Sequence, residues 1–146
     1  MNVKLLNAGR YAECIDQAAR EQRQAIRQLV LGHQKAFDEL AEVWEECRKP
    51  GWDGYGAWAV EQETLRNTYQ VIESLPLGFP RPSISAQPDG QLTLEWYRSP
   101  TRTLSISIYP GGYIHFAGLF GVEKLFGTVP LLGGLPARIL RLASEV

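Results

Sequence analysis

The stretch Gly51-Trp52-Asp53-Gly54-Tyr55-Gly56-Ala57 divides the chain into two parts with different periodicities. Before it, apolar residues recur with the spacing of a helix, and from Ser83 onward they alternate with the spacing of strands. Pro50 ends the first part, because it disfavours helical backbone at the residue before it. Gly54 and Gly56 open backbone conformations that other residues rarely adopt. We therefore predict a hinge here, with Asp53 accepting backbone hydrogen bonds and Trp52 packed inward.

Residues 11–48 have the composition and spacing of one long amphipathic helix, and we treat residues 1–50 as this helix and residues 51–146 as an α+β domain. Apolar residues recur at alternating steps of four and three, the heptad spacing of helices that pair with other helices. Gly32 leaves the helix either continuous or broken in two. The residues at this spacing, called the heptad stripe below, are Ile15, Ala19, Gln22, Ile26, Leu29, His33, Ala36, Leu40, Val43 and Cys47.

The heptad stripe changes width along the helix. Val30, Phe37 and Trp44 recur every seven residues and widen its second half, which favours packing on the rest of the domain. The narrower first half favours self-association, so we expect a homodimer joined through residues 11–47. The alternative is that the whole stripe faces the core or folds back on itself at Gly32.

The rest of the chain predicts a sheet with helices on one face. Residues 59–75 predict a second helix, and the four segments 83–87, 91–97, 103–109 and 113–119 predict strands. Tight connections join these strands, which gives an antiparallel meander of four. Alternation places four side chains on the apolar, helix-covered face: Leu94, Trp96, Ile106 and Ile108.

Two further segments follow the last predicted strand. Residues 120–134 are rich in Gly, Leu and Phe and contain Leu-Phe-Gly for the second time in the chain, so we expect a buried or partner-covered loop there. Residues 135–143 predict a third helix, with Pro136 in its first turn. The fold class is therefore α+β, with a long N-terminal helix and a four-stranded meander covered by one or two helices.

Composition excludes several classes of protein. The net charge is −1 and no basic stripe is visible, so we expect no nucleic-acid partner. No apolar run is long enough to span a bilayer, so we expect no membrane partner. Cys14 and Cys47 are too few for a disulfide framework, which favours a cytoplasmic protein with reduced thiols. These two cysteines approach each other only if two helices pack antiparallel.

Three segments together resemble a set of small uncharacterised bacterial proteins. They are the Trp-Asp-Gly-x-x-Ala stretch at 52–57, the strand ending Leu94-Glu95-Trp96, and the segment Ala117-Gly118-Leu119-Phe120-Gly121. The resemblance spans about residues 51–143 and includes the closing Leu-Pro helix. It implies a bacterial protein of the same fold, and it supplies no catalytic residues.

Few residues are candidates for chemistry. No His, Cys, Asp or Glu cluster has metal-ligand spacing, so we expect no metal and no cofactor. Asp53 is either a turn acid that accepts loop N–H groups or a carboxylate held between Trp52 and Tyr55 for a ligand. The candidate residues for binding a ligand or partner are Trp52, Asp53, Tyr55, His115, Phe120, Lys124 and Phe126.

Two classes of function remain. The first is a non-enzymatic bacterial accessory protein, an antitoxin- or immunity-like module that binds another protein and is itself a dimer. The second is a small enzyme or ligand binder that uses Asp53 and Tyr55 with His115 or Lys124. A pocket that joins these side chains favours the second class, whereas exposed apolar side chains over residues 117–134 favour the first.

Overall fold

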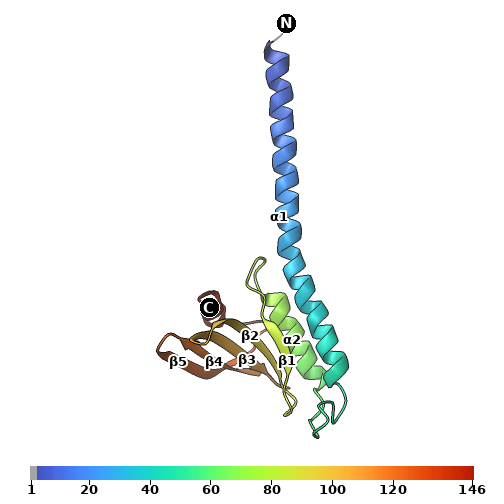
Figure 1. The fold of residues 1–146 in the computed structure, drawn as a ribbon, viewed down its shortest axis with the longest axis vertical. Coiled ribbons are helices and arrows are strands. Elements are labelled where there is room, and N and C mark those ends of the chain that lie inside the picture. Colours follow the sequence, from blue (N-terminus) through green and yellow to red (C-terminus); the bar gives the residue numbers. More distant parts are fainter. Residues whose placement is uncertain (1–2) are drawn as a thin grey trace.

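The chain forms a long helix, a second helix, five antiparallel strands and a short third helix, as seen in a computed structural model (Figure 1). The structure describes residues 3–146, with the side chains of residues 8–28 and 30–146. The place of the Leu29 side chain in the heptad stripe is therefore outside the described part. The elements are α1 (Val3–Cys47), α2 (Gln62–Ser74), β1 (Ser83–Ala86), β2 (Leu92–Ser99), β3 (Arg102–Ile108), β4 (Tyr113–Phe120), β5 (Glu123–Pro130) and α3 (Ala137–Ser144).

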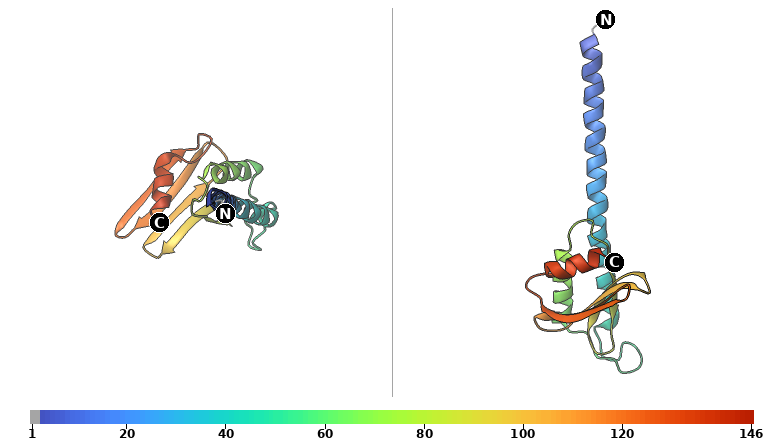
Figure 2. Two further views of the ribbon diagram at one scale, coloured as in Figure 1. Left: turned by 90° about the horizontal axis from the view of Figure 1, so that it is seen from above. Right: turned by 90° about the vertical axis from the view of Figure 1, so that its left-hand side faces the viewer.

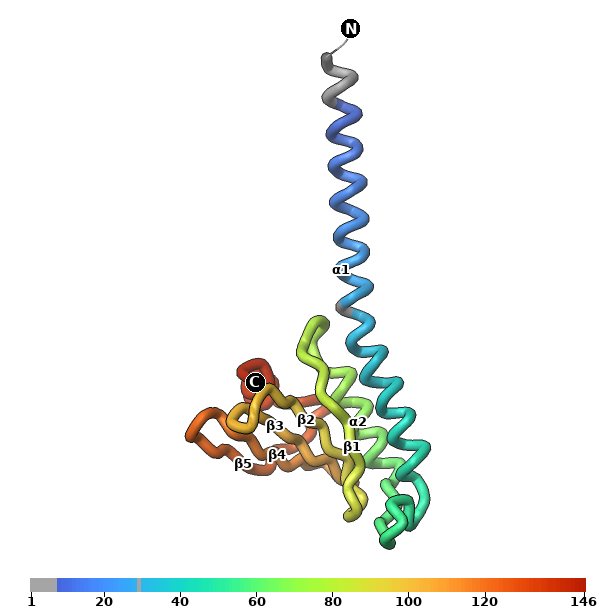
Figure 3. The backbone as a smooth tube through the Cα atoms, in the orientation of Figure 1, coloured from blue at the N-terminus to red at the C-terminus, as the bar shows by residue number. Residues whose placement is uncertain are grey.

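Helix α1 runs without a break through Gly32, which settles the question of a hairpin at that residue. Only its C-terminal part packs on the domain, where Ala36, Leu40 and Cys47 are buried against α2 and β1. The N-terminal part extends far beyond every other element (Figure 1; the tube in Figure 3 follows the same path). The last turns of α1 thus belong to the core of the domain.

The five strands form one sheet in the order β1-β2-β3-β4-β5, with every pair antiparallel. Period-two alternation puts one set of side chains in the core, as the sequence predicts for Leu94, Trp96, Ile106 and Ile108, all of which are buried. The opposite face carries serine, threonine and glutamate together with several exposed aromatic rings. We call this opposite face the open face.

The fifth strand corrects the sequence prediction of a loop over residues 120–134. Phe120 pairs with Glu123, so Gly121 and Val122 alone form the turn, and Gly121 has the positive φ of +69° that this turn requires. Gly127, which looks like a loop residue, lies in mid-strand. A Cβ added there would lie 3.0 Å from the ring of Phe116, so the glycine makes room for that ring.

Helices α2 and α3 and the end of α1 cover the apolar face of the sheet (Figure 2). Val71 and Ile72 of α2 and Ile139 of α3 are fully buried in the same core as the inward strand residues. Hydrogen bonds hold the elements in place: the Ile84 N–H on the outer edge of β1 donates to Glu39 Oε1 of α1 at 2.9 Å. This contact closes part of an otherwise open sheet edge.

Helix α2 starts later than the sequence predicts, at Gln62 instead of residue 59. Residues 58–60 are extended because they bond to distant segments. The Trp58 N–H donates to the carbonyl of Pro88 at 2.9 Å, and the Val60 N–H donates to the carbonyl of Cys47 at 2.9 Å. Helix α3 likewise begins after Pro136, which is its N-cap residue and not part of its first turn.

We predict that Trp96→Ala lowers the free energy of unfolding by about 3–5 kcal/mol, as for other buried aromatic residues. The Trp96 indole Nε1 donates to the carbonyl of Pro80 at 2.7 Å, and its ring meets Phe79 edge-on. The matched control is Tyr97→Ala, on the same strand but facing the other way and 61% exposed, which we expect to cost less than about 1 kcal/mol. Equal losses for the two variants in denaturant titration would contradict the assignment of the strand faces.

Candidate functional site

The loop at residues 51–57 is held by the carboxylate of Asp53. Its Oδ1 accepts hydrogen bonds from the N–H groups of Tyr55 at 2.8 Å and Ala57 at 3.0 Å. Gly54 and Gly56, with φ of +79° and +86°, let the backbone turn around this oxygen. The bond from Tyr55, followed by that from Ala57, lowers the pKa of Asp53 below its ordinary value. The prediction that Asp53 accepts backbone hydrogen bonds is confirmed.

The same loop is anchored on the domain by its tryptophans. Trp52 packs against the core, and its Nε1 donates to the carbonyl of Trp58 at 3.0 Å. Trp58 in turn lies beside the β1–β2 turn, near Gly90. The inward position predicted for Trp52 is confirmed. Two aromatic rings of the loop face solvent instead, since Tyr55 is 94% exposed and the Trp58 side chain is also largely exposed.

The candidate residues of the sequence analysis do not converge on one site. The loop of Asp53 and Tyr55 lies beside the β1–β2 turn, at one edge of the sheet. His115 is on β4 and Lys124 on β5, at the other edge. Strands are about 4.8 Å apart, so this separation amounts to roughly 15 Å. No acid–base pair forms between the two groups.

The remaining candidates point to different faces of the sheet. Phe120 is half-buried against the core, whereas Phe126 is 83% exposed on the open face. His115 Nδ1 lies 2.6 Å from the hydroxyl of Thr128, and its ring meets Tyr109 edge-on. These contacts leave His115 without a carboxylate partner of the kind that general base catalysis uses.

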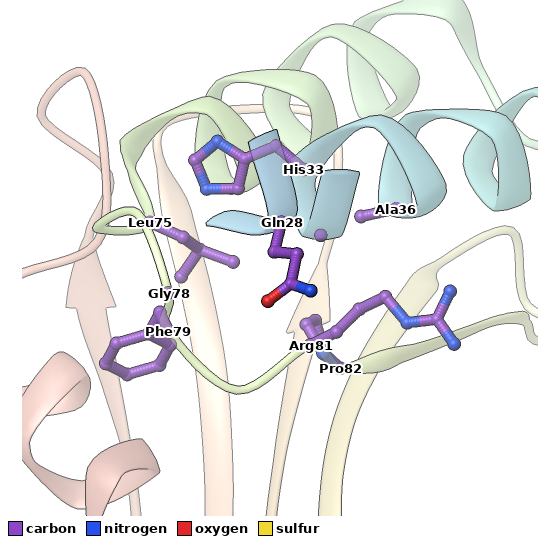
Figure 4. Close-up of a pocket in the computed structure, with 9 residues that line it drawn as sticks. Gln28, His33, Ala36, Leu75, Gly78, Phe79, Arg81 and Pro82 are labelled. Atoms are coloured by element: carbon purple, nitrogen blue, oxygen red, sulfur yellow. The ribbon is translucent and has the colours of Figure 1, made fainter. Parts of the chain in front are cut away.

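A cavity of about 230 Å³ lies where α1 leaves the domain (Figure 4). One wall is α1 at Gly32, His33 and Ala36, and the other is the segment after α2, with Leu75 and Phe79. The Nε2 atom of His33 is buried and has no hydrogen-bond partner in the described part of the chain. The sequence analysis does not predict this cavity. Gly32 and His33, a small and a polar residue next to each other on α1, are the feature of the sequence that could have indicated it.

The N-terminal part of α1 carries unpartnered apolar side chains on the heptad stripe. Ile15 is 70% exposed and Ile26 is half exposed, as is Val30 beside the stripe. Cys14 is also exposed, but Cys47 is buried in its own domain. Cys47 therefore does not face Cys14 of a second copy in an antiparallel pair, as the sequence analysis had considered.

The described residues contain neither a membrane-spanning helix nor a metal-binding cluster. Within residues 3–146, no helix is apolar enough over a sufficient length to cross a bilayer. No group of three or more His, Cys, Asp or Glu side chains in that range is arranged to hold a metal ion.

We predict that Asp53→Asn lowers the midpoint of denaturation only slightly at pH 7, because the amide keeps an oxygen for the two loop N–H groups. Asp53→Ala leaves the Tyr55 and Ala57 donors without an acceptor and is expected to lower the midpoint further. Equal midpoints for the two variants would contradict a role for these hydrogen bonds. Loss of a binding activity in Asp53→Asn at unchanged stability would instead place Asp53 in a site.

The lowered pKa of Asp53 gives this comparison a pH dependence. A carboxyl whose pKa is lower in the folded state stabilises the fold above its unfolded pKa, about 3.9. That stabilisation is lost as the pH falls through the folded pKa. We therefore expect the difference in midpoint between the natural protein and Asp53→Asn to be constant above about pH 5 and to shrink at lower pH.

Comparison with known proteins identifies no relative of this chain. No protein-family model, no curated protein and no solved structure matches it. The resemblance to small bacterial proteins thus stays a prediction, and the proposals below rest on the geometry of the chain itself.

Proposed function

We propose that the chain is a non-enzymatic protein-binding module that forms a homodimer through α1. Its role is that of an accessory protein, such as a bacterial antitoxin or immunity protein, which acts by contact with another protein. The chain offers surfaces for such contacts rather than an enclosed set of reactive groups.

The observation that carries the proposal is the exposed half of the heptad stripe. Residues 8–28 of α1 contain no buried side chain, yet Ile15 and Ile26 lie there at heptad spacing and are exposed. A single helix of this kind is marginally stable in water. Burial of one Ile side chain contributes about 1.5–3 kcal/mol, so pairing of Ile15 and Ile26 with a second helix would stabilise α1 substantially.

The arrangement of the reactive side chains favours this proposal over an enzyme. The Asp53 carboxylate is engaged by the backbone of its own loop, and His115 contacts Thr128. Acid–base catalysis needs at least two such groups within reach of one substrate, whereas the Asp53 loop lies beside the β1–β2 turn and His115 lies on β4.

The open face of the sheet provides a second surface for a protein partner. Tyr97, Tyr113 and Phe126 project from it with most of their side chains exposed. Val122 and Leu132 add exposed apolar side chains at either end of β5. Aromatic residues on a rigid sheet are typical of the centres of protein–protein interfaces.

We predict that the unmodified protein has twice the monomer mass in light scattering at tens of micromolar, and that Ile26→Asp is a monomer. A charge placed in the dimer seam has no partner there, so it opposes association. Because Ile26 lies beyond the part of α1 that packs on the domain, the fold of residues 36–146 should survive. The helical circular dichroism signal should fall, since the unpaired end of α1 loses its support.

The matched control is Gln24→Asp, which introduces the same charge two residues away on the opposite side of α1. Gln24 is exposed and outside the heptad stripe, so this variant should remain a dimer. A monomer mass for the natural protein in light scattering at these concentrations would contradict the proposed dimer.

A further inference from the structure

We propose that two copies pair through α1 in antiparallel orientation, with Ile15 of each copy opposite Ile26 of the other. In this arrangement Tyr11 of each copy enters the cavity beside His33 of the other. This inference rests on the proposed homodimer and adds its orientation, its register and the occupant of the cavity.

The position of the domain on α1 decides the orientation. Ala36, Leu40 and Cys47 continue the heptad stripe and are buried by the domain, so the domain lies on the side of α1 to which these side chains point. Figure 1 shows the domain beside the C-terminal part of α1 alone. In a parallel pair the two stripes face each other, and both domains would then occupy the same space between the helices. In an antiparallel pair the two domains lie at opposite ends of the paired helices, so they do not compete for one space.

The spacing of the heptad stripe decides the register. In an antiparallel pair with Ile15 opposite Ile26, every heptad position of one helix between residues 8 and 33 lies opposite a heptad position of the other. Ala19 then lies opposite Gln22, so that a small side chain meets a larger one. A parallel pair would set Ala19 against Ala19 and Gln22 against Gln22. The antiparallel layers, each of one Ala and one Gln, have equal volumes, whereas the parallel layers differ in volume. Equal layers fill the space between two helices more evenly.

Charge on one edge of the stripe fits the same register. Asp16 and Arg23 are seven residues apart on this edge, and the antiparallel register brings Asp16 of each copy beside Arg23 of the other. Two-fold symmetry makes this contact twice. A parallel pair places Tyr11 and Ala18 next to these charges instead and forms neither contact. Within one copy Asp16 already bonds Arg20 at 2.7 Å, and its exposed carboxylate has acceptor sites for a second cation.

Small residues on the other edge let the two helices approach closely. This edge carries Ala18, Ala25 and Gly32, and the register brings Ala18 of each copy beside Ala25 of the other. Its one large residue is Tyr11, which is 72% exposed in a single copy. Tyr11 falls opposite Gly32 of the second copy, where a Cβ would meet no atom within 4 Å.

The cavity lies where this tyrosine points. Helical side chains lean towards the N-terminus of their own helix, which in the reversed copy carries Tyr11 past Gly32 towards Ala36. Gly32 and Ala36 both line the cavity of about 230 Å³. An apolar cavity of about 150 Å³ already accepts benzene, so there is room for the ring. His33 also lines this cavity, and its Nε2 is buried without a hydrogen-bond partner among the described residues, so we assign the Tyr11 hydroxyl to this atom.

The orientation is tested by cross-linking two single-cysteine variants, Asp16→Cys and Arg23→Cys, co-expressed with tags of different size. Both carry Cys14→Ser, because Cys14 is exposed and would react. Cys47 stays, since it is buried and burial raises the pKa of its thiol, which makes it unreactive. With a short bis-maleimide we expect the mixed species, Asp16→Cys joined to Arg23→Cys, and little of either variant joined to itself.

The outcomes separate the orientation from the dimer. Cross-linking of each variant mainly to itself, in a protein of dimeric mass, would overturn the antiparallel arrangement and leave the proposed function standing. A dimeric mass with the mixed cross-link absent would overturn the register. A monomeric mass would overturn the proposed dimer together with this inference.

The cavity contact is tested by the dissociation constant of the dimer in sedimentation equilibrium. Tyr11→Ala should weaken association by at least about tenfold, as for a buried aromatic residue in an interface. Tyr11→Phe keeps the ring and loses only the hydrogen bond to His33. Its dissociation constant should therefore lie between those of the natural protein and Tyr11→Ala. The control Arg10→Ala, on the outer side of α1, should leave the constant unchanged. An unchanged constant for Tyr11→Ala would overturn the assignment of Tyr11 to the cavity.

Discussion

The heptad stripe of α1 meets two different environments along one helix. From Ala36 to Cys47 the sheet and α2 cover it, and this contact ties the helix to the domain. Towards the N-terminus Ile15, Gln22 and Ile26 of the same stripe are exposed, although the spacing does not change. Exposure of apolar surface to water is unfavourable in proportion to its area. The covered half of the stripe therefore stabilises the fold, and burial of the uncovered half against another chain would favour association. The shape of the protein and its proposed function both depend on this division.

The loop at residues 51–60 sets the path by which the chain returns from α1 to the sheet. Its first part turns around the Asp53 carboxylate, and its extended second part bonds to the carbonyls of Pro88 and Cys47. Each of these hydrogen bonds satisfies a backbone N–H that would otherwise be unpaired. The Trp52 ring fills the space beneath the loop. The hydrogen bonds of Asp53 and the positive φ of Gly54 and Gly56 give these residues a structural role within the loop.

Several polar side chains of the domain form hydrogen bonds within the fold. Asn67 of α2 donates to the carbonyls of Tyr109 and Gly111, and Glu63 accepts from the Gly111 N–H, so that α2 holds the β3–β4 turn. No helix of the described residues covers the open face, which carries Tyr97 and Phe126 in exposed positions. The sheet with its exposed aromatic rings and the helix with its exposed heptad residues are the two surfaces on which the proposed function rests.

Local patterns in the sequence determined much of this structure. Heptad spacing predicted the helix that became α1, and alternation predicted the inward side chains Leu94 and Trp96, because both depend only on the repeat of the backbone itself. The bonds of Asp53 to the backbone were predictable for the same reason, since their donors lie within four residues.

Contacts between distant segments decided the rest. The sequence does not predict strand β5, because a glycine such as Gly127 is typical of loops. Its place in the strand is explained only by the ring of Phe116 on the neighbouring strand, which lies against it. The start of α2 was misplaced because Trp58 and Val60 bond to Pro88 and Cys47. The separation of Asp53 from His115 and the cavity beside His33 also follow from strand order and from the angle at which α1 leaves the domain. Neither property is encoded in the spacing of neighbouring residues, so only the tertiary structure could decide them.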